Sequence, residues 1–265
     1  DADLARSLNN VSNHYATLAE LETTREGRLI WLRKAVDAVE DAIAMRRALG
    51  IQADLASSLH NVSNRYGEMA GLEPARDARR TWLQKAIHAA EEGVAIQDAL
   101  GIRGAMAMSL NSMSNRCAQL AEMEPAREGW DAWLRKAIEA AEASVEIQRE
   151  LGVPGDLAVS LGSLGNRFHM RASAETDRTR RMDDLRSSRD AAEEAGRLFR
   201  AAGEIKFLLL SLQDLVSAHG LLAEMGDPAD VEILRALCLE GNQLARSMRD
   251  GEAEAFFTGI LDWIE

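Results

Sequence analysis

The chain has 265 residues, of which 46% are hydrophobic and 28% are charged, and its formal net charge at pH 7 is -12. This acidic balance argues against a nucleic-acid-binding protein or a protein docked on anionic membrane, because both present basic surfaces. No apolar run reaches the roughly 18 residues of a membrane span, and no signal peptide opens the chain. Cys117 and Cys238 have neither metal-ligand spacing nor a disulfide framework, so the sequence favours a cytoplasmic protein.

A repeat with a period of 51 residues runs through the chain. Its first block reads LARSLNNVSNHY from Leu4, LASSLHNVSNRY from Leu55, MAMSLNSMSNRC from Met106, LAVSLGSLGNRF from Leu157 and LLLSLQDLVSAH from Leu208. Its second block begins at Trp31, Trp82 and Trp133, and the units close on Gly50, Gly101, Gly152 and Gly203. The period predicts units at about 1–51, 52–102, 103–153, 154–204 and 205–251, followed by residues 252–265.

Each unit contains two segments with the pattern of a helix. In the first segment, apolar residues spaced 4, 3, 4, 3 form one stripe, which we expect to be buried against the second segment: Leu4, Leu8, Val11, Tyr15 and Leu18. Aspartates precede this stripe and are candidate N-caps, namely Asp3, Asp54 and Asp156. The second segment is rich in alanine, glutamate and lysine, and Pro74 and Pro125 lie where it would begin. The Leu-Gly dipeptides that close the units are typical of helix C-caps.

The end of the chain predicts a stack that is closed by a last helix. The pair at about 204–249 is the least regular, and Gly226-Asp227-Pro228 marks its inner turn. Phe256, Ile260 and Trp263 then recur at helical spacing, which predicts a helix that covers the final pair. The start at Asp1, without an initiator methionine, suggests a piece cut from a longer protein.

The repeat resembles the tetratricopeptide repeat (TPR), in the long form seen in kinesin light chains and bacterial signalling proteins. Leu8, Val11-Ser12 and Tyr15 resemble the pattern of its first helix, and Ala35, Val39 and Ala42 that of its second. The usual period is 34 residues; here both ends of the pair are extended, which predicts longer helices. The resemblance implies an all-α, right-handed α-solenoid of about five helix pairs plus a capping helix, forming a single domain over residues 1–265.

One polar column is a candidate binding site. Counting 100° per residue, Asn13 points about 180° away from the apolar stripe. The resemblance places this position in the concave groove, where an asparagine often holds a peptide backbone, and an amide can both donate and accept. Duplication alone would also repeat these residues. The candidate peptide-binding residues are Asn13, Asn64, Asn115 and Asn166, with Asn9, His60 and Asn111 beside them.

A second column is basic, and the second segments carry an acidic one. We expect arginine-glutamate bridges between neighbouring helices, with an anionic ligand as the alternative. The two columns are Arg65, Arg116 and Arg167, and Glu40, Glu91, Glu142 and Glu193.

No motif for catalysis, a metal or a cofactor is present: the chain has no Walker loop, GxSxG, HExxH or zinc spacing. We expect the repeated serines to be small residues for close helix packing, and the repeated tryptophans to be apolar anchors. The sequence therefore predicts a non-enzymatic scaffold that needs no cofactor and binds a basic or neutral protein or peptide segment. The alternatives are a sensor or regulatory domain of a larger bacterial defence or signalling protein, and an oligomer that assembles through the solenoid ends.

Overall fold

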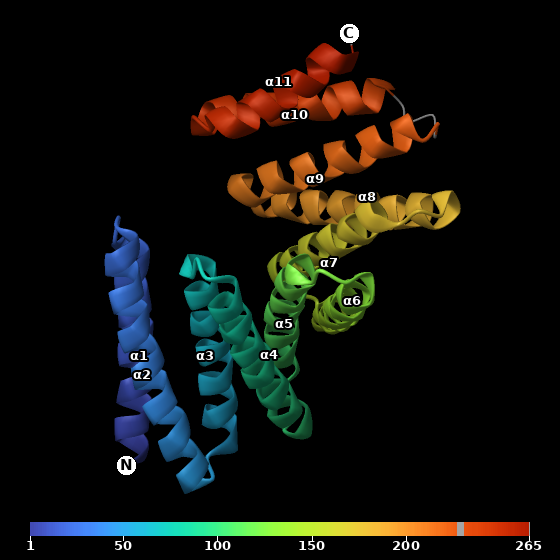
Figure 1. Cartoon of the computed structure of the whole chain (residues 1–265). Helices are drawn as coiled ribbons and strands as arrows, with labels where there is room; N and C mark the ends of the chain where they lie inside the picture. The colour runs from blue at the N-terminus through green and yellow to red at the C-terminus, as the bar shows by residue number, and fades with distance from the viewer. Residues whose placement is uncertain (227–230, 265) are drawn as a thin grey trace. The chain divides into compact units, whose positions relative to one another are not determined.

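The computed structural model describes residues 1–226 and 231–264, and these residues form eleven helices and no strand. The helices are α1 (Ala2–Leu21), α2 (Arg25–Leu49), α3 (Gln52–Leu72), α4 (Arg76–Ala99), α5 (Arg103–Met123), α6 (Arg127–Leu151), α7 (Pro154–Ala174), α8 (Arg178–Ala202), α9 (Ile205–Glu224), α10 (Val231–Met248) and α11 (Gly251–Ile264). Helices that follow one another pack together, as in the pairs α1–α2, α3–α4, α7–α8 and α9–α10 (Figure 1), which confirms the all-α solenoid of TPR-like pairs. The helices have 14 to 25 residues, so the pairs are long, as the extended repeat predicts.

The chain forms two compact units, Asp1–Ile147 and Gln148–Glu265, and α6 runs across their boundary. In unit 1, α3 packs against both α2 and α4, and α5 packs against α4. In unit 2, α8 packs against α7 and α9, and α10 packs against α9 and α11. The predicted grouping of all repeats into one domain stays a prediction.

Glycines in a left-handed conformation end the repeats where the sequence predicts C-caps. Gly50, Gly101, Gly152 and Gly203 have φ values of 68°, 67°, 66° and 73°. A left-handed residue lets the last carbonyls of the helix accept hydrogen bonds from the backbone that follows, and only glycine adopts this conformation without a steric cost. The same turn therefore connects each second helix to the next first helix, and it keeps the 51-residue register.

The predicted helix starts need correction. Asp3, Asp54 and Asp156 are not N-caps, because α1, α3 and α7 begin at Ala2, Gln52 and Pro154, which places the aspartates inside the first turn. There a carboxylate still interacts favourably with the positive end of the helix dipole. The second helices α4 and α6 begin two residues after Pro74 and Pro125.

The apolar stripe of the first helices packs differently from the prediction. In α3, Leu55, Leu59, Val62, Tyr66 and Met69 are buried in a cluster that includes residues of both α2 and α4. The stripe thus faces the preceding pair as well as its own second helix. In α1, which no preceding helix covers in the structure, Leu4, Val11 and Leu18 are exposed, so their expected burial against α2 is wrong.

Small residues fill the interface between the two helices of each pair. Of α1, the buried residues are Ala5, Asn9, Ser12, Ala16 and Ala19. In pair 2, Ser63 donates a hydrogen bond to the carbonyl of Ala86 (2.8 Å). In pair 4, a Cβ on Gly165 would lie 3.2 Å from the carbonyl oxygen of Ser188. The helices of a pair therefore approach closely enough that their backbones nearly touch, as the small columns predict.

The C-terminal helix covers α10 with a different residue from the one expected. Phe257 and Ala253 are buried, and Trp263 is 59% exposed, so the predicted stripe of Phe256, Ile260 and Trp263 is wrong as the packing face. The predicted inner turn at Asp227-Pro228 lies outside the described residues.

One described helix, α9, is long and apolar enough in composition to cross a membrane. Many of its leucines, such as Leu208, Leu212 and Leu215, are buried within unit 2.

Candidate functional site

The first helices of unit 1 form one continuous surface. Besides its second helix, each first helix contacts the next one, because α1 contacts α3 and α3 contacts α5. We call this surface the inner face of unit 1. It carries three members of the predicted asparagine column: Asn13 is exposed, and Asn64 and Asn115 are half-buried. Asn166, the fourth member, is exposed on α7 in unit 2.

The neighbouring column of Asn9 and His60 holds successive first helices together. Asn9 is 9% exposed, and its Oδ1 accepts hydrogen bonds from the hydroxyl of Ser58 (2.9 Å) and the amide of Asn61 (3.2 Å). One repeat later, His60 Nδ1 lies 3.1 Å from Ser109 Oγ. Ser58 and Ser109 of the serine column are thus hydrogen-bonding partners between repeats, in addition to being small. The role of Asn9, His60 and Asn111 in binding a ligand stays a prediction.

The tautomer of His60 follows from its two partners. Asn64 Nδ2 can only donate and lies 3.1 Å from His60 Nε2, so that nitrogen accepts and the ring proton lies on Nδ1. Nδ1 then donates to Ser109. Burial, together with the nearby charge of Arg65, lowers the pKa of His60, which keeps the ring neutral at pH 7. His60 is therefore a neutral bridge between Asn64 on its own helix and Ser109 of the next first helix.

The arginine column does not pair with the acidic column in the contacts of unit 1. Arg65 pairs with Glu68 on its own helix (2.6 Å), and Arg116 donates to Gln119 (3.3 Å). Glu40 instead accepts from the hydroxyl of Tyr66, and Glu91 pairs with Lys136. The expected arginine-glutamate bridges between these columns are therefore wrong here: Glu40 and Glu91 reach the next repeat through a tyrosine and a lysine.

Arg116 lies flat against the preceding first helix. A Cβ on Gly67 would fall 2.2 Å from its guanidinium carbon, so any larger residue at position 67 would require the Arg116 side chain to shift. Burial lowers the pKa of Arg116, and the carboxylate of Glu68 opposes that shift.

The tryptophans form a repeated arrangement with tyrosine and lysine within each of the first two pairs. Tyr15 and Trp31 lie 5.7 Å apart, and Lys34 lies 4.4 Å from the Trp31 ring centre. Tyr66 and Trp82 repeat this arrangement at 5.6 Å, with Lys85 4.8 Å from Trp82. The tryptophans therefore anchor the second helix to the first, as predicted. They do not begin the second helices, because α2 and α4 begin at Arg25 and Arg76, six residues earlier.

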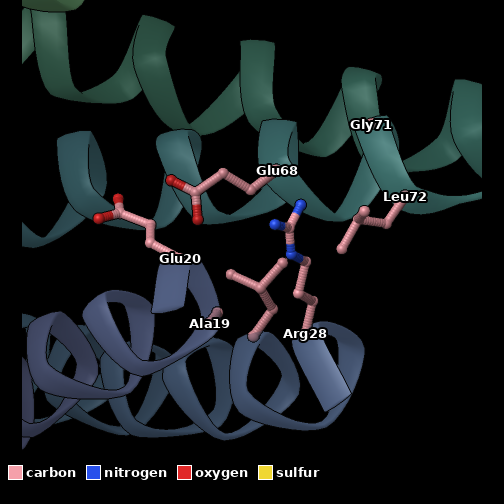
Figure 2. Close-up of a pocket in the computed structure, with 7 residues that line it drawn as sticks. Ala19, Glu20, Arg28, Glu68, Gly71 and Leu72 are labelled. Carbon is pink, nitrogen blue, oxygen red and sulfur yellow. The ribbon is translucent and has the colours of Figure 1, made fainter. Parts of the chain in front are cut away.

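A cleft that the sequence analysis missed lies at the hairpin end of the first two pairs. It has a volume of about 470 Å³ and is lined by Ala19, Glu20, Arg28, Leu32, Glu68, Gly71 and Leu72. Figure 2 shows the carboxylates of Glu20 and Glu68 directed toward the same space, and the side chain of Arg28 extending from α2 toward α3. Glu68 comes one helical turn after Asn64 and therefore lies on the same face of α3.

Gly71 opens this cleft, because no atom would lie within 4 Å of a Cβ built on it. The repeat register of the sequence could have indicated this cleft, because position 71 is glycine where the equivalent positions of the first and third repeats are Glu20 and Glu122. A small residue that interrupts a column of long ones leaves space beside its neighbours.

Comparisons with known structures agree with this architecture. This chain is similar to the crystal structure of the TPR-like repeats of a Podosopora anserina protein that is assigned as a kinesin light chain. The similarity covers 94% of this chain and 99% of that chain, with a TM-score of 0.60 and 15% sequence identity. A variant of those repeats is similar over 94% of this chain and 98% of its own, with a TM-score of 0.61 and 15% identity. The chain has the fold of a TPR-like helical repeat protein. No model of a protein family and no curated protein matches this sequence.

Proposed function

We propose that this TPR-like protein is a non-enzymatic scaffold that binds an extended, basic or neutral peptide segment along the inner face of unit 1. The amides of Asn13, Asn64 and Asn115 would hold the peptide backbone. An amide both donates and accepts, so each can pair with one peptide unit whatever the peptide side chain is. This function is supported by the similarity to repeat scaffolds in fold.

The observation that carries the proposal is the position of the cleft. Asn64 and Glu68 lie on one face of α3, and Glu20 projects from α1 into the same cleft. A chain held at Asn64 could place a lysine or arginine side chain against the carboxylate of Glu20, since Glu68 already pairs with Arg65, and its aliphatic stem against Leu72 and Ala19. The net charge of -12 would add to the attraction of a basic segment over longer distances.

The experiment is a screen of extended peptides that differ in charge, followed by titration of the best binder. Replacing both Asn64 and Asn115 by alanine should weaken binding by roughly tenfold or more, since each lost hydrogen bond contributes about 0.5–1.5 kcal/mol. The matched control replaces Asn10 and Gln84, which are exposed outside the candidate column. An unchanged affinity in the asparagine double variant would reject the inner face as the site.

A second variant tests the charge of the partner. Glu20→Gln removes one carboxylate of the cleft without changing the size of the side chain. It should weaken a basic peptide and leave a neutral peptide unaffected, and the difference should shrink as salt is added. If basic peptides bind no better than acidic ones to the unaltered chain, the proposed role of the cleft is wrong.

A further inference from the structure

A chain of three hydrogen-bonding side chains connects the interior of unit 1 to its inner face. Its inner end is Ser109 of α5, which is fully buried, and Ser109 Oγ lies 3.1 Å from Nδ1 of His60. Its outer end is Asn64 of α3, which is half-buried, and Asn64 Nδ2 lies 3.1 Å from Nε2 of His60. The imidazole of His60 therefore contacts the buried serine with one nitrogen and the candidate peptide-binding amide with the other.

The contact with His60 fixes the orientation of the Asn64 amide. When an asparagine amide turns over, its oxygen and its nitrogen exchange places, and only the nitrogen can donate to an unprotonated Nε2. One N–H of Asn64 is thus used, and among the described residues no donor reaches Oδ1. Asn64 therefore keeps one acceptor, Oδ1, and one N–H donor for a ligand. A peptide unit offers the complementary pair of groups, an N–H and a carbonyl.

This orientation depends on the protonation state of His60. A protonated imidazole carries hydrogens on both nitrogens, so Nε2 would then donate and could no longer accept from Asn64. The amide would have to turn over and direct Oδ1 at His60, which removes the acceptor that a peptide N–H needs. Histidine is the side chain whose charge ordinarily changes between about pH 5 and pH 8. The equivalent positions of the other repeats cannot change their charge in this way, because they are Asn9, Asn111, Gly162 and Gln213.

The surroundings of His60 favour its neutral form. Burial, and after it the positive charge of Arg65 on the same helix, lower the pKa of His60 from its ordinary value of 6.5. Among the described residues, no charged group of α1, α2, α4 or α5 acts on the ring. From α4, the nearest approach is made by a glycine: a Cβ built on Gly93 would lie 3.9 Å from the backbone nitrogen of His60. The neutral ring, and with it the orientation of Asn64, therefore prevails at pH 7.

We propose that His60 is a positioning residue of the peptide site: its neutral form holds the Asn64 amide with Oδ1 available to one N–H of the bound peptide, and its protonation releases the peptide. This inference rests on the proposed function, because it concerns the same asparagine. The peptide residue that is held at Asn64 needs a backbone N–H, which excludes proline at that position. Because the bound state requires the neutral ring, affinity falls as the pH drops through the pKa of His60, and the bound peptide lowers that pKa further.

The first test uses the chain alone and needs no peptide. At pH 7.5, nitrogen-15 NMR of the histidine rings should show the proton of His60 on Nδ1 and an unprotonated Nε2, and a titration should give a pKa below 6.5. Asn64→Ala should raise this pKa, since it removes a hydrogen bond that favours the neutral ring, and Asn64→Asp should raise it further, because a carboxylate favours the charged ring. A proton on Nε2 at pH 7.5, or a pKa that Asn64→Asp leaves unchanged, would overturn the proposal.

The second test measures affinity from pH 7.5 to one pH unit below the measured pKa of His60. The probe is the tightest-binding peptide of the screen that has blocked ends and lysine as its only titratable side chain. Affinity should fall about two- to tenfold, the range for one lost hydrogen bond, in parallel with the protonation of His60. His60→Leu should bind about two- to tenfold more weakly at pH 7.5 and lose this pH dependence. His60→Gln should recover part of the affinity without the pH dependence, since glutamine also offers an acceptor to Asn64.

The matched controls are His14→Gln and His88→Gln, because both histidines are exposed and lie outside the hydrogen-bonded chain. Each should keep the fall in affinity, and circular dichroism should show that every variant keeps its helices. The proposed function and the role of His60 fail differently. If Asn64→Ala leaves the affinity for the peptide unchanged, the inner-face site itself is wrong. If Asn64→Ala weakens binding, but affinity does not follow the protonation of His60 or His60 does not titrate above pH 4.5, the site stands and the positioning role is rejected.

Discussion

Two leucines in equivalent positions of neighbouring repeats should respond very differently to truncation. Leu4 lies in the segment LARSL and is 54% exposed, while Leu55 lies in LASSL and is 2% exposed. Leu55→Ala removes three buried carbon groups, which contribute about 0.8 kcal/mol each, and it leaves a cavity among the side chains of α2 and α4. We therefore expect it to lower the free energy of unfolding by about 2.5–4 kcal/mol.

Leu4→Ala should cost about 0.5 kcal/mol or less, because the residue is exposed and alanine is an equally good or better helix former. Urea titration followed through the emission of Trp31 and Trp82, which pack against the same cluster, measures both variants. Equal denaturant slopes would show that the midpoints report stability. If Leu4→Ala costs as much as Leu55→Ala, the two positions are not different in packing, and the reasoning from the exposed and covered faces fails.

Three further substitutions test single interactions. Tyr66→Phe should destabilise unit 1 by about 1–3 kcal/mol in urea titration, because it removes the hydrogen bond to the charged Glu40. Gly50→Ala should cost about 1–2 kcal/mol, since the residue has a φ of 68°, whereas Gly71→Ala, in an open helical position, should gain about 0.5–1 kcal/mol; equal effects in thermal melts would contradict both assignments. Burial raises the pKa of Asp214 to about 6, so the folded state holds this proton up to a higher pH than the unfolded state does. Its contribution to the stability of unit 2 should fall as pH rises from about 4 to about 6, and Asp214→Asn should remove this component of the pH profile of urea unfolding.

The helix pairs could be predicted from the sequence because the same period recurs in every kind of signal. Apolar spacing, alanine-rich segments and closing glycines all repeat after 51 residues, and a left-handed glycine such as Gly50 marks a helix end through local sterics alone. The N-caps could not be placed as well. An aspartate such as Asp54 is favourable both as a cap and in the first turn, so its presence does not distinguish the two positions.

The repeat period could not show which helix covers each apolar face. Periodicity shows that Leu4 and Val11 share an apolar face, but it does not show whether a helix of the same pair or of the preceding pair covers that face. The two columns of opposite charge raised the same problem. Every column in a repeat protein has the same period, so matching periods cannot show that Arg65 and Glu40 are in contact. Their positions along the helix axes decide which residues meet, and in the structure Tyr66 is the residue that contacts Glu40.

The candidate site was predicted in part. The register identified Asn13, Asn64 and Asn115 as one column, and the structure places them on helices in contact. It did not identify Glu68 as a neighbour of the cleft, because the space beside it depends on the missing side chain of Gly71 and on the angle between two helix pairs.

The unbroken register also bears on how such a chain can change its length. Gly50 and Gly101 lie in the same turn, so a segment of 51 codons that starts at one and ends at the other encodes one complete helix pair with its connection. Recombination between the similar stretches at Leu4 and Leu55 would add or remove such a segment without shifting the reading frame. Every new junction would join a second helix to a first helix through a turn and an interface that the protein already uses. Copy number can therefore vary in single steps between otherwise related chains.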